Sequence, residues 1–345
     1  MQFEDIKKES DRTEKSQLKF NADGSIDLPD SVKDDLEKQK KEMKKLDIWN
    51  DMSENNDDEE KEYNLTDNVS GFNLYSNDLK LNPLKFSNNK TQEDVVNEVI
   101  TLINIGKKVI FIKGVCGTGK SAIALNLAKK LGRASIIVPG KALQKQYMKD
   151  YSKQKYVLKD NHKKLKIKVI TGRENHPCLY KTGCSADESD LPCKIEINEK
   201  NIDKLKEYIS ENPKVKNDLI LKEIRRISVA PVCPYWSPII PSEMDYPLSA
   251  EKREYLGLNN TKFKIYNRKP GCRYYNQFNS YLDSEVIVFN SMKYKLEMLM
   301  NRKPATDVEI IDECDEFLDS FANINRINLT RLMNTLTKLY IDDDR

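Results

Sequence analysis

One segment, Gly114–Ser121, constrains this chain more than any other. Its sequence, Gly-Val-Cys-Gly-Thr-Gly-Lys-Ser, fits the phosphate-binding pattern G-x-x-x-x-G-K-[S/T]. It lies between a β-branched run, Lys108–Ile112, and an apolar-faced helical stretch, Ser121–Leu131. Glycines let backbone N–H groups curl around phosphates, and a following helix adds its positive dipole end. The pattern therefore predicts a strand, a phosphate-binding loop and a helix that together bind ATP.

Each residue of the loop has an expected task in that site. Lys120 would place a full charge on the phosphates, and the Ser121 hydroxyl would bind Mg²⁺. The expected nucleotide contacts come from the loop as a whole: Gly114, Gly117, Thr118, Gly119, Lys120 and Ser121.

A second nucleotide motif is expected near the C-terminal end of the sequence. The apolar run Val308–Ile311 would be a strand that delivers Asp312 and Glu313 at its carboxyl end, where ligands of parallel sheets gather. Asp312 would hold Mg²⁺ through water, and Glu313 would orient and deprotonate the attacking water. Lys120, Asp312 and Glu313 are thus the predicted catalytic residues.

The arrangement of apolar runs predicts an α/β fold, a parallel sheet with helices on both faces. Thr91–Ile105 has a helical apolar face with Thr91 as its N-cap. The further strands are expected at four runs: Ala134–Val138, Ile167–Thr171, Glu285–Asn290 and Val308–Asp312.

Composition divides the chain into parts. Residues 1–75 are expected to form a charged, largely disordered arm, with a helix possible around 28–49. The ATPase domain is predicted over 76–171 and 285–320. Residues 172–284 are too long for a loop and would form a mostly helical insertion. A helical stretch at 321–345 would begin a further, truncated domain.

Charge and hydropathy exclude several classes of protein. Hydrophobic residues make up 38% of the chain and charged residues 33%, and the net charge is only +3, so a basic surface for nucleic acid would have to be local. We find no secretory signal and no membrane-spanning run, which predicts an intracellular protein of the cytoplasm, nucleoid or nucleus without a membrane partner.

The insertion contains five of the seven cysteines: Cys178, Cys184, Cys193, Cys233 and Cys272. In a reducing compartment, clustered cysteines more often bind a metal than form disulfides. Their spacing differs from that of a zinc ribbon, whereas four scattered thiolates could hold an iron–sulfur cluster. Zinc, or five unrelated buried cysteines, are the alternatives.

Several segments resemble the XPD/DinG-type superfamily-two DNA helicases over roughly residues 80–320. Thr171–Cys178 (TGRENHPC) is similar to the segment that carries the first cluster cysteine, and Ser185–Cys193 resembles the stretch with the second. Cys233-Pro-Tyr-Trp and Gly271-Cys272-Arg-Tyr-Tyr resemble the elements of the third and fourth. Residues 139–147 are similar to motif Ia of the family, which touches the DNA backbone.

The resemblance implies the first RecA-like motor domain of an ATP-driven helicase that moves 5′ to 3′ on single-stranded or forked DNA. It implies a [4Fe-4S] cluster on Cys178, Cys193, Cys233 and Cys272, since Cys184 has the weakest motif context. By position, Gln92 would contact adenine, Lys141 would contact nucleic acid, and Arg173 would lie near a phosphate or the cluster.

Two departures from the family pattern affect the interpretation. The family's Asp-Glu-Ala-His box is Asp312-Glu313-Cys314-Asp315 here, which leaves the coupling of hydrolysis to a second motor domain open. The sequence also stops soon afterwards, so we expect either a fragment or a partner chain that supplies the second RecA-like domain. Alone, the chain would bind ATP and hydrolyse it poorly.

Lysine and aromatic residues interleave at 141–168 and 262–275, a composition that suits single-stranded nucleic acid. Two alternatives to the helicase remain at this point. One is a zinc-stabilised P-loop ATPase of another class, such as a packaging or restriction motor. The other is a truncated module that binds nucleic acid or a partner without turning over ATP.

Overall fold

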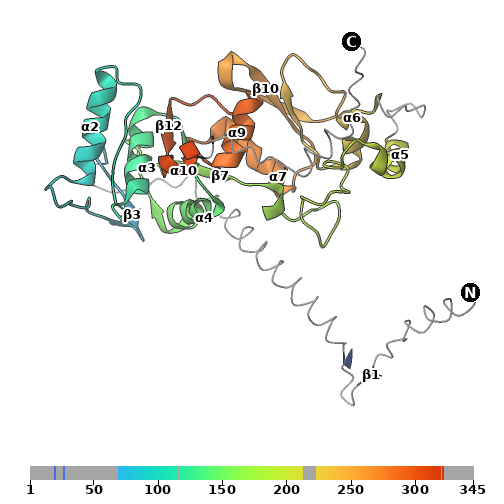
Figure 1. Cartoon of the computed structure of the whole chain (residues 1–345), viewed down its shortest axis with the longest axis horizontal. Coiled ribbons are helices and arrows are strands. Elements are labelled where there is room, and N and C mark those ends of the chain that lie inside the picture. Colours follow the sequence, from blue (N-terminus) through green and yellow to red (C-terminus); the bar gives the residue numbers. More distant parts are fainter. Residues whose placement is uncertain are drawn as a thin grey trace, which may run out of the picture.

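The computed structural model describes residues 69–115, 117–212, 223–319 and 321, together with two paired strands, β1 (Lys19–Phe20) and β2 (Ile26–Asp27). The helices expected around 28–49 and 327–340 lie outside the described residues. Figure 1 shows the folded part.

A four-stranded parallel sheet forms the centre of the fold. Its order is β12 (Val308–Ile311), β5 (Ala134–Val138), β11 (Val286–Asn290) and β7 (Ile167–Ile170). Every neighbouring pair is parallel. The four continuous apolar runs are therefore confirmed as strands, and the mixed α/β class with them. Continuous runs are favoured because both faces of such a sheet are buried.

Side chains of successive strand residues pack into two different cores. Ile136 and Val138 face a core shared with α2 (Gln92–Asn104) and α3 (Lys120–Leu131). Thr91 begins α2 with a capping box, as the sequence predicts. Ile137 faces the opposite core. The alternation is the period of two that a strand imposes on its side chains.

Aromatic side chains dominate the second core, and most of them come from the insertion. Tyr255, Phe263 and Phe278 pack there against Phe289 of β11 and against Tyr294 of α9 (Ser291–Leu299). The insertion is thus part of the sheet's packing. Figure 1 shows β10 and α9 beside each other over the sheet.

The insertion contains more strand than expected. Three antiparallel strands, β8 (Ile239–Pro241), β10 (Lys262–Asn267) and β9 (Glu251–Leu256), form a second sheet in that order. The expectation of a mostly helical insertion is wrong for this part, because alternate residues of β10 bury themselves in the aromatic core. Its short helices are α5 (Ile202–Ser210), α6 (Arg226–Val229), α7 (Arg273–Asn276) and α8 (Ser280–Asp283). Its 3-10 turns are Arg173–Asn175, Glu199–Asn201, Ala230–Val232, Leu258–Asn260 and Gln277–Asn279.

The strand expected at Lys108–Ile112 does not form. Val109 is 73% exposed and Phe111 is 76% exposed, and no described strand pairs with the outer edge of β12. Along β12 the side chains alternate between half-buried and exposed. That edge therefore offers little apolar surface to hold a further strand.

Residues 69–75 pack into the domain, so the folded part starts before the boundary that composition suggests. Phe72 and Leu74 enter the first core. Strands β3 (Tyr75–Ser76), β4 (Leu79–Lys80) and β6 (Lys155–Tyr156) form a small antiparallel sheet. Asn73 is fully buried and exchanges hydrogen bonds of 3.0 Å with Asn126 of α3. No helix among the described residues is long and apolar enough to cross a membrane.

Asn73→Ala should destabilise this part of the fold. The Asn73 amide donates to Val69 O and Leu158 O and accepts from Leu158 N, at 2.9–3.0 Å. Removing it leaves buried backbone groups unpaired, so we expect the free energy of unfolding to fall by about 2 kcal/mol in chemical denaturation. Asn97→Ala, on the exposed face of α2, should change it by less than about 0.5 kcal/mol. Equal stability of the two variants would contradict this role.

Candidate functional site

The phosphate-binding loop leads into α3, with Gly119 as N-cap and Lys120 and Ser121 as the first helical residues. Gly119 has φ 70°, a left-handed conformation that favours glycine. A Cβ there would come within 2.2 Å of the Gln92 side-chain nitrogen. The loop is thus shaped by its contact with α2. Thr118 Oγ1 donates to Val115 O at 2.9 Å within the loop.

Gln92 is almost fully buried between α2 and the loop. Its Nε2 donates to Thr118 O at 3.0 Å and to Gly119 O at 3.3 Å. Its Oε1 accepts from Leu84 N at 3.0 Å. The structure therefore places Gln92 directly behind the phosphate loop, with both ends of its amide bound to backbone. Adenine contact by Gln92 stays a prediction.

The two predicted carboxylates follow β12 and meet the loop. Lys120 Nζ and Glu313 Oε1 form an ion pair at 3.1 Å. Glu313 has φ 53°, which few residues other than glycine adopt, and such strain is typical of functional sites. Asp312 N donates to Ile137 O at 2.8 Å, which continues the pairing of β12 with β5. The two motifs are therefore brought together as the parallel strands require.

A tyrosine that the sequence did not single out lies between the two motifs. Tyr147 belongs to α4 (Lys141–Lys149), is 1% exposed, and donates from its hydroxyl to Asp312 Oδ2 at 3.2 Å. Ser121 lies close enough to Tyr147 and Tyr151 to lower the pKa of both phenols, against the larger effect of burial. Burial raises the pKa of Asp312, while the Tyr147 hydrogen bond opposes that shift. Tyr147 lies in the segment 139–147, for which the resemblance implies DNA contact. Its contact with Asp312 joins residues 165 positions apart, so the sequence alone does not show it.

The cysteines of the insertion gather in one region. Cys193 and Cys233 lie close enough for each thiol to shift the pKa of the other. Cys272 lies close enough to Cys193, Cys233 and Cys178 for their charges to act on it. Cys184 interacts with Cys178, through a side-chain hydrogen bond and a 2.9 Å backbone bond.

Arginines surround these thiols. Arg173 donates to Cys193 Sγ at 3.3 Å and to Tyr275 OH at 2.9 Å. Hydrogen bonds from Cys233 and Arg173 and the charge of Arg173 lower the pKa of Cys193 to about 5, against the effect of burial. The charges of Arg226 and Cys193 act on each other, as do those of Arg268 and Cys233. Among the described residues, none of the three arginines has a carboxylate as ion-pair partner.

Within the part of the chain that the structure describes, no three His, Cys, Asp or Glu side chains converge closely enough to hold a single metal ion. His176 is buried and bound to Thr171 Oγ1 at 2.7 Å, and burial followed by the charge of Arg173 lowers its pKa to about 4. It is placed as a core residue.

Residues 85–226 match the family model described as "Type III restriction enzyme, res subunit". This stretch is a ResIII helicase-type domain. Such a domain is the N-terminal motor of superfamily-two helicases, for which ATP and Mg²⁺ are the expected ligands, and it supports an ATP-dependent nucleic-acid motor. Comparison with curated proteins and with solved structures gave no significant match.

The two interleaved Lys/aromatic segments, 141–168 and 262–275, differ from expectation. Tyr147, Tyr156, Phe263 and Tyr266 are all buried, so these rings pack in cores and cannot stack on bases. Lysine and aromatic residues alternate in these segments because each strand or helix has one face in the core and one face in solvent. Lys141 begins α4 and forms an ion pair with Glu174 near the Arg173 cluster, and both side chains are about half exposed.

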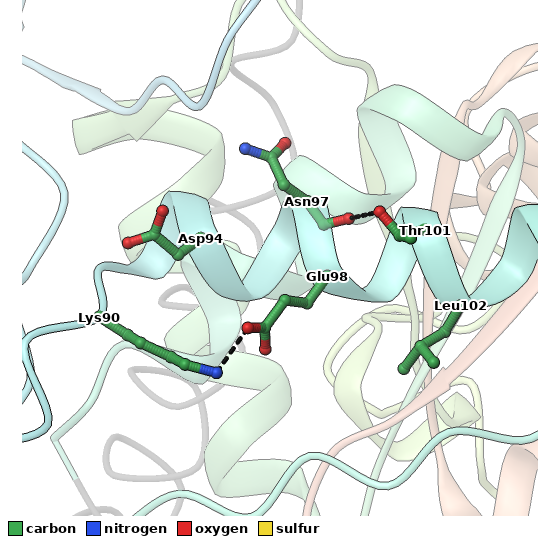
Figure 2. Close-up of a pocket in the computed structure, with 6 residues that line it drawn as sticks. All are labelled: Lys90, Asp94, Asn97, Glu98, Thr101 and Leu102. Carbon is green, nitrogen blue, oxygen red and sulfur yellow. Dashed lines mark hydrogen bonds and ion pairs between the residues drawn. The ribbon is translucent and has the colours of Figure 1, made fainter.

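A pocket of about 670 Å³ lies on the outer face of α2, away from the phosphate loop. Figure 2 shows Lys90 directed toward Glu98, and the Thr101 hydroxyl bound to the Asn97 carbonyl. Gln92, which supports the phosphate loop, is buried on the opposite side of this helix. The pocket is therefore separate from the nucleotide site.

Proposed function

We propose that this protein is an ATP-driven motor on DNA of the XPD/DinG type. The observation that carries the proposal is the meeting of Lys120 and Ser121 with Asp312 and Glu313 beside one sheet of a ResIII helicase-type domain. A phosphate loop and an acidic pair in this arrangement are the parts that phosphoryl transfer requires from a P-loop domain.

Without nucleotide, the Lys120–Glu313 ion pair joins the two groups that ATP would separate. Phosphate oxygens carry more charge than one carboxylate, so on ATP binding Lys120 would turn to the β- and γ-phosphates. Glu313 would then be free to orient and deprotonate water. Ser121 and Asp312 would hold Mg²⁺, which supplies charge neutralisation on the phosphates.

We propose that the cysteine region holds a [4Fe-4S] cluster on Cys178, Cys193, Cys233 and Cys272. In such a cluster each thiolate binds a different iron, so the thiols need not converge on one point as they do around zinc. The bound cluster and its thiolates carry negative charge. Arg173, Arg226 and Arg268 supply positive charge at this place and have no carboxylate partner among the described residues, which fits a bound anionic group.

Single-stranded or forked DNA is the proposed substrate, with 5′-to-3′ movement as the resemblance implies. Lys141 at the start of α4 is the proposed backbone contact, because its partner Glu174 leaves it half exposed. We do not propose Arg173 as a DNA contact. Its guanidinium is held by Cys193, Tyr275 and the faces of Tyr274 and Tyr275.

The test is ATP hydrolysis by the purified chain with and without single-stranded DNA. We expect stimulation by single-stranded DNA and weaker stimulation after Lys141→Ala, because the variant loses a phosphate contact. Lys90→Ala is the matched control, because Lys90 is likewise about half exposed and paired with a glutamate, Glu98, but lies beside α2 and outside the segment that resembles motif Ia. Nucleotide binding without DNA-dependent turnover would favour the non-hydrolysing module instead. Oligonucleotides blocked at either end would report the direction of movement.

A further inference from the structure

Tyr147 differs from the other buried aromatic residues in what its hydroxyl touches. The residue is 1% exposed, and a buried phenol needs hydrogen-bond partners. Its hydroxyl donates to Asp312 Oδ2 at 3.2 Å, and Ser121 lies close enough to lower the pKa of Tyr147 against the effect of burial. Phenylalanine would fill the same space with the same ring. The oxygen is therefore needed for its contact with these two groups.

The helix that carries Tyr147 is fixed to the sheet one turn earlier. Gln144 is 1% exposed and donates from Nε2 to Ile170 O at 2.9 Å. Its Oε1 accepts from Asn290 Nδ2 at 3.1 Å. These bonds tie α4 to the carboxyl ends of β7 and β11, beside the end of β5 that leads into α4. The Tyr147 hydroxyl thus reaches Asp312 from a rigid support.

The chain departs from α-helical geometry directly after this point. Asp150–Gln154 forms one turn of π-helix, a feature that often marks functional sites. The Tyr151 ring lies 5.6 Å from that of Tyr147, and Ser121 lies close enough to Tyr151 to lower its pKa against the effect of burial. Two tyrosines from the C-terminal end of one helix therefore lie close to the same serine, Ser121.

We propose that Tyr147 is a positioning residue for Mg²⁺, holding the Asp312 carboxylate and the Ser121 hydroxyl in the orientation that binds the ion. The inference rests on the nucleotide site proposed above. In this role Tyr147 would act through the two ligands, Asp312 and Ser121, rather than on the phosphates. Hydrogen-bonded supports of this kind commonly contribute 10- to 100-fold to metal affinity.

The experiment compares Tyr147→Phe with the wild-type chain in binding of a fluorescent ATP analogue during a Mg²⁺ titration. We expect the Mg²⁺ concentration at half-saturation to rise about 10-fold, with nucleotide affinity in EDTA unchanged within about two-fold. Tyr281→Phe is the matched control, because this tyrosine is fully buried and, among the described residues, its hydroxyl has no hydrogen-bond partner.

The outcomes separate the two proposals. A Mg²⁺ midpoint in Tyr147→Phe equal to that of the wild type would overturn the positioning role while leaving the nucleotide site intact. An equal loss of affinity with and without Mg²⁺ would also overturn it, because that is the result of a general loss of packing. A wild-type chain that binds no nucleotide would overturn the proposed function and this inference together.

Discussion

Glu313→Gln should bind ATP more tightly than the wild-type chain and hydrolyse it at least roughly 100-fold more slowly. The slower turnover follows because the amide cannot accept a proton from water. The tighter binding follows because the variant lacks the Glu313 carboxylate, which pairs with Lys120 at 3.1 Å before nucleotide arrives. A partly exposed ion pair is worth up to about 1 kcal/mol, so the gain in affinity should reach at most about five-fold.

Two measurements test this result: the Kd of an ATP analogue and the turnover rate under the same conditions. Glu316→Gln is a suitable control, since this carboxylate is exposed on α10 (Cys314–Asp319). It should leave both quantities unchanged. Weaker ATP binding by Glu313→Gln would contradict the idea that the Glu313 carboxylate competes with the ATP phosphates for Lys120. Turnover equal to that of the wild type would exclude Glu313 as the base.

The Cys272→Ser variant should lose the proposed iron–sulfur cluster. Cys272 is 8% exposed and lies among the other predicted ligands, so a hydroxyl there cannot replace the thiolate. We expect iron after anaerobic purification to fall from about four per chain to near zero, with loss of the absorbance near roughly 400 nm. ATP binding should persist, because the nucleotide groups come from other elements.

Cys184→Ser provides the control for that experiment. Among the other insertion thiols, Cys178 alone is described as acting on Cys184, whose Sγ donates to Lys181 O, so iron content should stay unchanged. Iron retained in Cys272→Ser, or lost in Cys184→Ser, would overturn the ligand assignment. One zinc ion per wild-type chain, in place of iron, would overturn the cluster proposal and favour a zinc site.

The sheet and its first helices were readable from the sequence because local pattern determines them. Continuous apolar runs predicted β5, β7, β11 and β12 to within a residue or two at each end. Thr91 marked the start of α2 as its N-cap. The meeting of the two nucleotide motifs was also predictable, because carboxyl ends of parallel strands share one edge of a sheet.

The features that escaped prediction depend on contacts between distant segments. The edge strand β9 reads Glu-Lys-Arg-Glu-Tyr-Leu, and only Tyr255 of it is buried, so its charges conceal a strand. Lys108–Ile112 has a strand's composition but lacks a neighbour that buries it. Arg173 was expected near a phosphate or the cluster, and its contact with Cys193, twenty residues away, decides between the two only once the chain is folded. The Tyr147 hydroxyl likewise needed the position of Asp312.

The place of β11 in the sheet links the folding of the two parts of the protein. Strand β11 lies between β5 and β7, yet more than one hundred residues separate it from the end of β7. Closing a chain segment of that length costs about 4 kcal/mol of conformational entropy, which the cysteine-bearing insertion must offset by ordering itself. During synthesis, β5 and β7 would therefore leave the ribosome with a vacant position between them. If the insertion folds around the proposed iron–sulfur cluster, the supply of iron during synthesis would affect the fraction of chains that insert β11 between β5 and β7.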